Sequence, residues 1–177
     1  MITGVDRHEG MLELFEATAR ASGVQVQTVL GRWPEVADEV EPADVAVCHH
    51  AIYDVLDIED FISALTSRAR RRVVLEVCAT PPDAGVDPLW KVLHGIERLP
   101  RMVGDDVQTV LVSMGLAVER EDIVLPARKQ AVTPKLVSLV RRRLHVGADR
   151  DQEIVEFLNA RAPEALPVIA LWWAGGA

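Results

Sequence analysis

The sequence lacks the residues and runs that mark several common classes of protein. It has only two cysteines, Cys48 and Cys78, and neither belongs to a Cys-x-x-Cys pair. That excludes a disulfide framework and a typical structural zinc site. No apolar run approaches the ~20 residues that cross a bilayer, and Asp6 and Glu9 follow the start too closely for a signal peptide. We therefore expect a cytoplasmic protein with no membrane partner.

Basic residues are also in the minority. Lysine and arginine number 19 against 27 acidic residues, a formal net charge of −8, which argues against nucleic acid as the main partner. The basic runs Arg70–Arg72 and Arg141–Arg143 are short, and we expect them at solvated helix ends or at the starts of strands. The chain is 49% hydrophobic and 26% charged, a composition typical of one globular domain of this length.

Apolar residues alternate between two periodicities. Short apolar runs are typical of strands buried on both faces, and stretches with a spacing near 3.6 are typical of amphipathic helices. The alternation predicts an α/β fold, a mostly parallel sheet with helices on both faces, in one domain over residues 1–177. Strands are expected at 2–5, 25–30, 44–49, 72–78, 117–124 and 167–173, and helices at 8–22, 33–40, 58–69, 87–97, 105–114, 134–144 and 150–161.

Local signals predict several helix ends. Thr133 before Pro134 indicates an N-cap and a first-turn proline, and Asp57 can cap the helix after it. Gly115 is expected to end the helix over 105–114.

The segment 81–104 breaks the alternation, because two helical pieces follow a strand without a short turn. It is either an ordinary covering segment or a lid over the carboxyl edge of the sheet, where open α/β folds bind ligands. As a lid, it would use Trp90 and His94, four residues apart on one helix, to shape the substrate pocket.

Polar and aromatic residues follow the first two predicted strands. Asp6 ends the first strand, where it is either a helix N-cap or an acid that accepts hydrogen bonds from both ribose hydroxyls of a nucleoside. Gly31, Arg32 and Trp33 follow the second strand. They form either a turn with one packed tryptophan or the border of an adenine site.

The third strand ends in Cys48-His49-His50, with Tyr53 shortly after. Alternation along a strand places Cys48 and His50 on one face and His49 on the other. A metal site is disfavoured, because no fourth ligand stands at a recognisable spacing. His50 is therefore either a packed histidine or a general base, a role that suits imidazole near neutral pH.

Residues Val5 to Leu12, Val-Asp-Arg-His-Glu-Gly-Met-Leu, resemble the second motif of class I S-adenosylmethionine-dependent methyltransferases. Each motif is degenerate, so the evidence is their succession over nearly the whole chain. The later ones follow in the family's order, at 44–53 and 55–65 for the fourth motif, 73–77 for the fifth strand, and 118–125 with 168–173 for the closing antiparallel pair.

The resemblance implies a Rossmann-like methyltransferase sheet, S-adenosylmethionine as cofactor and a small molecule as methyl acceptor. In the family the strand-ending acid holds the ribose, the later Met-Leu pair packs by the adenine, and the fourth-motif strand ends near the methionine part. The expected cofactor residues are Asp6, Arg7, Met11, Gly31, Arg32, Trp33, Cys48 and His49. The protein mainly aligns the reactants, so His50 and Tyr53 are candidates for orienting or deprotonating the acceptor.

One motif of the family is missing. Its first strand and G-x-G-x-G turn precede the ribose acid, but here five residues precede Asp6 and no two glycines stand two positions apart. Without that central strand, the strands of Asp6 and Cys48 would keep unpaired backbone groups, at roughly 1–3 kcal/mol each. We therefore expect an N-terminally truncated domain to which an upstream βα unit belongs, with impaired cofactor binding.

Two other functions stay open. A non-catalytic methyltransferase-like scaffold or partner subunit fits the missing glycine turn. A nicotinamide-dependent oxidoreductase would also use a ribose-binding acid, but the only tyrosine, Tyr53, has Asp57 four positions later where short-chain reductases have lysine. A hydrolase is disfavoured because there is no G-x-S-x-G elbow.

Overall fold

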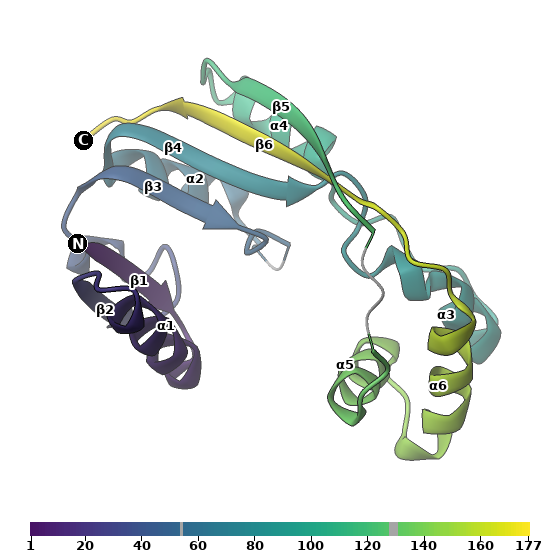
Figure 1. Cartoon of the computed structure of the whole chain (residues 1–177). Helices are drawn as coiled ribbons and strands as arrows, with labels where there is room; N and C mark the ends of the chain where they lie inside the picture. The colour runs from purple at the N-terminus through teal and green to yellow at the C-terminus, as the bar shows by residue number, and fades with distance from the viewer. Residues whose placement is uncertain (54, 128–130) are drawn as a thin grey trace. The chain divides into compact units, whose positions relative to one another are not determined.

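The computed structural model describes residues 1–53, 55–127 and 131–177, and its elements lie close to the expected ones (Figure 1). Its strands are β1 (Ile2–Asp6), β2 (Val26–Leu30), β3 (Ala43–His49), β4 (Ala69–Cys78), β5 (Glu119–Leu125) and β6 (Leu166–Ala174). Its α-helices are α1 (Glu9–Ala21), α2 (Ile58–Ser67), α3 (Asp87–His94), α4 (Gly104–Ser113), α5 (Pro134–Leu144) and α6 (Asp151–Ala160).

One expected helix and one expected strand start are wrong. The helix expected over 33–40 is only a 3-10 turn at Ala37–Glu39. Of this segment only Ala37 is buried, and so short a helix needs more packing than that to be stable. The second error is at 69–72, where β4 begins directly after α2. The arginines at 70–72, near the start of this strand, are solvent-exposed. The strand therefore begins before its apolar run, from which its position was predicted.

The predicted helix ends are confirmed. The Thr133 hydroxyl accepts a hydrogen bond from the Leu136 amide at 3.2 Å, and the Asp57 carboxylate accepts one from the Asp60 amide at 3.0 Å. Gly115 follows α4 at φ +80°, a left-handed conformation that favours glycine.

The strands form two separate sheets, β1-β2 and β3-β4-β6-β5. β1 is parallel to β2, and β3 is parallel to β4, while Figure 1 shows β6 running opposite to β4 and β5. Within the described residues, no strand pairs with the second edge of β1 or with the second edge of β3. These are the strands of Asp6 and Cys48, so the expected break in the sheet lies where the missing motif predicts it.

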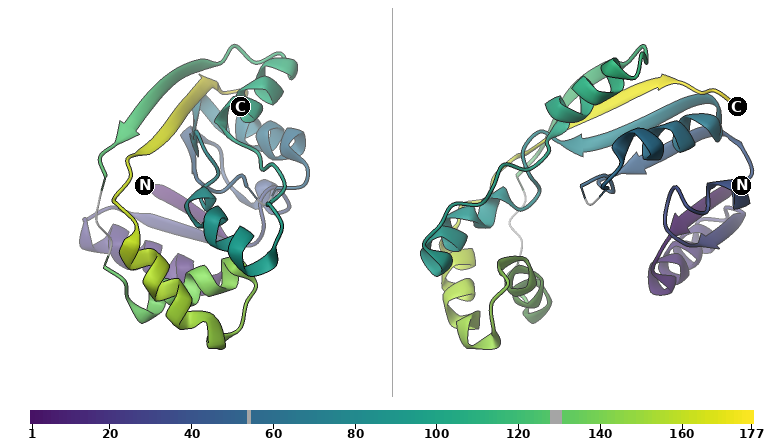
Figure 2. Two further views of the ribbon diagram at one scale, coloured as in Figure 1. Left: turned by 90° about the vertical axis from the view of Figure 1, so that its right-hand side faces the viewer. Right: turned by 180° about the vertical axis from the view of Figure 1, so that it is seen from behind.

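Helices α2 and α4 lie on the same face of the four-stranded sheet (Figure 2). The Trp173 indole on β6 donates to the Thr66 hydroxyl on α2 at 2.9 Å. Gly104 at the start of α4 lies so close to β6 that a Cβ there would stand 2.5 Å from Ile169 Cδ1. On the opposite face of β3, Val45 and Val47 are 46% and 58% exposed.

In the two-stranded sheet, α1 packs on both strands. A Cβ at Gly4 of β1 would stand 2.6 Å from the Phe15 ring on α1, so glycine allows the close approach of helix and strand. The Thr28 hydroxyl on β2 donates to the Glu16 carboxylate on α1 at 2.9 Å.

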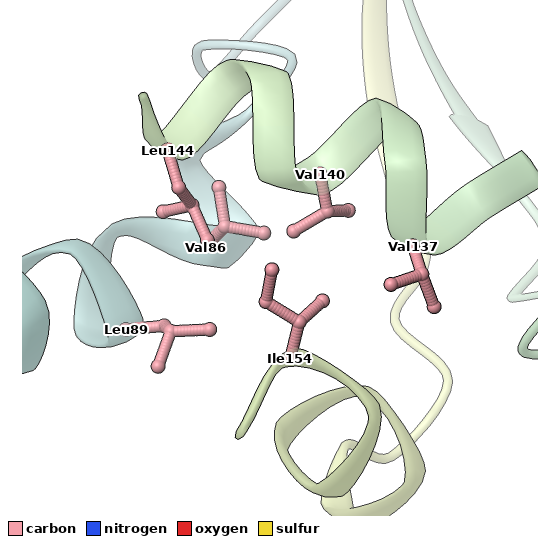
Figure 3. Packing of buried hydrophobic residues seen from close by; sticks show 6 residues of the cluster. All are labelled: Val86, Leu89, Val137, Val140, Leu144 and Ile154. Carbon is pink, nitrogen blue, oxygen red and sulfur yellow. The ribbon is translucent and has the colours of Figure 1, made fainter. Parts of the chain in front are cut away.

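The chain divides into two compact units. The first, the sheet unit, comprises Met1–Glu76, Gln108–Arg120 and Leu171–Ala177, and the second, the helical unit, comprises Val77–Val107 and Glu121–Ala170. The helical unit has its own core, in which side chains from α3 and the 3-10 turn before it, from α5 and from α6 converge (Figure 3): Val86, Leu89, Val137, Val140, Leu144 and Ile154. Among the described helices, none is long and apolar enough to cross a bilayer.

Candidate functional site

Asp6 closes β1 at the carboxyl end of the two-stranded sheet. Its side-chain Oδ1 accepts a hydrogen bond from the His8 amide at 2.8 Å, and its carbonyl oxygen accepts one from the Gly31 amide at 3.0 Å. The N-cap of α1 is His8 rather than Asp6. Asp6 therefore braces the turn into the helix while its half-buried carboxylate stays at the strand tip beside Gly31.

The turn after β2 is tightly packed at Gly31. A Cβ there would stand 2.1 Å from Val36 Cγ1, so the position has no room for a side chain. The Trp33 indole donates to the Phe61 carbonyl on α2 at 3.1 Å, which makes it a packed tryptophan. Arg7, Met11 and Arg32 are exposed.

At the end of β3, the side chains of Cys48, His49 and His50 lie in different environments. Cys48 is buried in register with Leu75 of β4, and burial raises the pKa of its thiol to about 11. His49 is exposed and in register with Glu76, so the two side chains lie on the opposite face.

His50 leaves the strand at φ +53°, in the left-handed region. Its ring reaches Glu76, with Nε2 3.0 Å from Oε1. Because Glu76 points to the face opposite Leu75 and Cys48, the expectation that Cys48 and His50 share a face is wrong. Alternation holds only within the strand, and the strand ends at His49.

The structure brings His50 and Tyr53 together. His50 Nδ1 lies 3.3 Å from the Tyr53 hydroxyl, and the two rings are near parallel, with 15° between their planes. No local pattern in the sequence points to Glu76, the third member of this group. Only the register of β3 on β4 places it beside His50.

Trp90 and His94 come together in the helical unit. Their ring centroids are 4.2 Å apart, the Arg98 guanidinium lies 4.3 Å from the Trp90 ring, and His94 Nε2 lies 2.8 Å from the Leu144 carbonyl. Both rings thus make packing contacts within that unit. No group of three or more metal-ligating side chains is found in residues 1–53, 55–127 and 131–177.

No protein-family model and no curated protein matches the sequence, but solved structures match the fold. The YcgJ protein of Bacillus subtilis is 18% identical over 99% of this chain and 82% of its own, with a TM-score of 0.58. Magnesium protoporphyrin IX methyltransferase (ChlM) of Synechocystis PCC 6803, with S-adenosylhomocysteine bound, is 14% identical over 99% of this chain and 64% of its own, with a TM-score of 0.59. Precorrin-6y C5,15-methyltransferase of Geobacter metallireducens is 15% identical over 99% of this chain and 67% of its own, with a TM-score of 0.53.

The chain has the class I methyltransferase fold. This fold accounts for the unpaired edges of both β1 and β3. In it, the strand before the glycine-rich turn lies between the strands that here carry Asp6 and Cys48. β1 and β3 are those two strands, and each has an edge that no described strand pairs with.

Proposed function

We propose that this chain contributes to S-adenosylmethionine-dependent methyl transfer to a small-molecule acceptor. The observation that carries the proposal is the corner made by Asp6 and Gly31, on a fold shared with ChlM, which was crystallised with S-adenosylhomocysteine. A half-buried carboxylate at the tip of a parallel strand, beside a glycine with no room for a side chain, suits a ribose with two hydroxyl donors.

The chain's residues fit the nucleoside half of this cofactor. Asp6 would accept from the ribose hydroxyls, Met11 would pack by the adenine, and the exposed Arg7 and Arg32 flank the same corner. Trp33 would contribute its ring, because its indole N–H already bonds the Phe61 carbonyl. The buried Cys48 and the exposed His49 would border the methionine part. The 177 residues hold no glycine-rich turn, so we expect weakened binding.

Methyl transfer needs little acid–base chemistry from the protein. The cofactor, when bound, supplies an electrophilic methyl group, and the protein aligns the acceptor with it. His50 and Tyr53, at the carboxyl end of β3, would orient an acceptor or take its proton.

The test of this proposal is a calorimetric titration of S-adenosylhomocysteine into the wild-type chain and into Asp6→Ala. We expect wild-type binding and at least a tenfold higher Kd for Asp6→Ala, because the ribose loses its charged acceptor. Asp44→Ala is the matched control: it removes an exposed acid from β3 and should leave the Kd unchanged. Equal Kd values for all three proteins would contradict the role of Asp6.

The open edges favour a second candidate, a non-catalytic partner subunit. Val45 and Val47 expose apolar surface on β3, one of the strands with an unpaired edge among the described residues, and such edges accept strands from other chains. The native protein purified from its source would then be a stoichiometric hetero-complex. A monomer that turns over a methyl acceptor would exclude this candidate.

A further inference from the structure

We propose that Glu76 is a positioning residue, and that Glu76, His50 and Tyr53 form a proton relay for an acceptor whose nucleophilic oxygen or nitrogen still carries a proton. This inference rests on the proposed function, because it assigns a class of acceptor to the same site. All three residues belong to the sheet unit.

Two bonds from Glu76 hold His50. The His50 amide donates to the Glu76 carbonyl at 3.0 Å, and His50 Nε2 lies 3.0 Å from Glu76 Oε1. The backbone of His50 has φ +53°, a left-handed conformation that residues with a Cβ rarely adopt. The strained backbone turns the ring toward the neighbouring strand, where the carboxylate meets it.

The carboxylate determines which ring nitrogen carries the proton. An ionised carboxylate only accepts hydrogen bonds, so Nε2 of the neutral imidazole is the donor and Nδ1 keeps its lone pair. That lone pair lies 3.3 Å from the Tyr53 hydroxyl, which can donate to it. The arrangement therefore runs from Tyr53 to His50 to Glu76 with each donor facing an acceptor.

The relay accounts for every proton of the transfer. The acceptor's lone pair forms the new bond to the methyl carbon, the sulfur–carbon bond breaks, and the sulfur keeps that electron pair. The proton leaving the acceptor goes to the Tyr53 oxygen as the Tyr53 proton passes to His50 Nδ1. The resulting imidazolium is stabilised by Glu76, and it later releases a proton to water.

Exposure separates this role from a purely structural one. The side chains of His50 and Glu76 are 39% and 23% exposed. An ion pair so open to solvent contributes little to stability, so its main effect is to orient the ring. A substitution at Glu76 should therefore loosen the orientation of the His50 ring without unfolding the sheet unit.

The experiment is an NMR comparison of histidine-labelled wild-type protein with Glu76→Ala, Glu76→Gln and Tyr53→Phe at one mildly alkaline pH. The wild-type His50 ring should be as rigid as the backbone, with an order parameter of about 0.85. In Glu76→Ala the order parameter of this ring should fall below about 0.6. Glu76→Gln should retain the rigid ring, because its amide oxygen still accepts from Nε2. Tyr53→Phe should leave the ring rigid and move the His50 Nδ1 resonance, because that nitrogen loses its donor.

His94 is the internal control, since it belongs to the helical unit, where its Nε2 lies 2.8 Å from the Leu144 carbonyl, and its signals should not change in the three variants. An unchanged ring order in Glu76→Ala would overturn the positioning role, and an unchanged Nδ1 resonance in Tyr53→Phe would overturn the relay. S-adenosylhomocysteine should bind Glu76→Ala as it binds wild type. Failure of the wild-type chain to bind it would count against the proposed function alone, because the NMR result needs no cofactor.

Discussion

Cys48 and His50 are two residues apart, and their environments differ sharply. The Cys48 side chain faces the core beneath β3, whereas His50 turns out toward Glu76. Residue types alone singled out His50 and Tyr53, because few side chains move protons near neutral pH. Glu76 could not be found in this way. Its meeting with His50 depends on the pairing of two strands that are separated by a helix, and no local pattern encodes that register.

The buried Cys48 thiol predicts a loss of stability at high pH. Desolvation raises its pKa from 9.0 to about 11 in the folded chain. A raised pKa contributes stability that is present below pH 9 and is lost as the pH rises through 11. Urea unfolding of wild type should therefore lose up to about 2 kcal/mol relative to Cys48→Ala across this window. Parallel pH dependences for the two proteins would show that the thiol is not buried as described.

At the scale of elements, helices and their caps were the most predictable. Thr133 with Pro134 and Asp57 act through bonds within one turn, so a short stretch of sequence contains the whole signal. Strand positions were also predicted, but their partners were not fully predictable. The apolar run at 44–49 reads as a buried strand, although Val45 and Val47 are exposed on the face away from α2.

This exposure predicts an asymmetry between neighbouring strands. Val47→Lys on β3 should change the free energy of unfolding by no more than about 0.5 kcal/mol, because its side chain is 58% exposed. Leu75→Ala on β4 should cost about 2–5 kcal/mol, because Leu75 is fully buried. Urea denaturation of both variants provides the measurement. A large loss in Val47→Lys would mean that another strand or chain covers β3 in solution.

In the helical unit, Arg98 joins several segments. It pairs with Asp83 and Asp87, donates to the Arg143 carbonyl and stacks on Trp90, and its side chain is only 10% exposed. Arg101 pairs with the same two acids, at 3.2 and 2.7 Å.

Arg98→Ala should therefore destabilise this unit by about 3 kcal/mol, because it leaves two partly buried carboxylates with one cation. Thermal unfolding followed by circular dichroism measures the loss. The matched control is Lys91→Ala, which breaks an exposed pair with Glu97 and should leave the melting temperature unchanged. Equal melting temperatures for the two variants would contradict the role given to Arg98.

At the scale of the whole molecule, the succession of motifs that begins at residues 5–12 predicted the class I methyltransferase fold by resemblance. The fold is shared with proteins that are 14–18% identical, because burial patterns persist where individual residues do not. The division into a sheet unit and a helical unit was not predicted. The sequence between them has no Gly- or Ser-rich linker, since the boundaries fall within β4, α4, β5 and β6. The roles proposed for Trp90 and His94, and for 81–104 as a lid, stay predictions.

The central claim is that the carboxyl ends of β1, β2 and β3 hold S-adenosylmethionine. Amide hydrogen exchange of the 177-residue chain, with and without saturating S-adenosylhomocysteine, tests it most directly, with NAD as the control ligand. We predict slower exchange at residues 6–12, 30–33 and 48–50 with S-adenosylhomocysteine, and no change there with NAD. A folded chain whose exchange at these segments is the same with and without S-adenosylhomocysteine would contradict the claim.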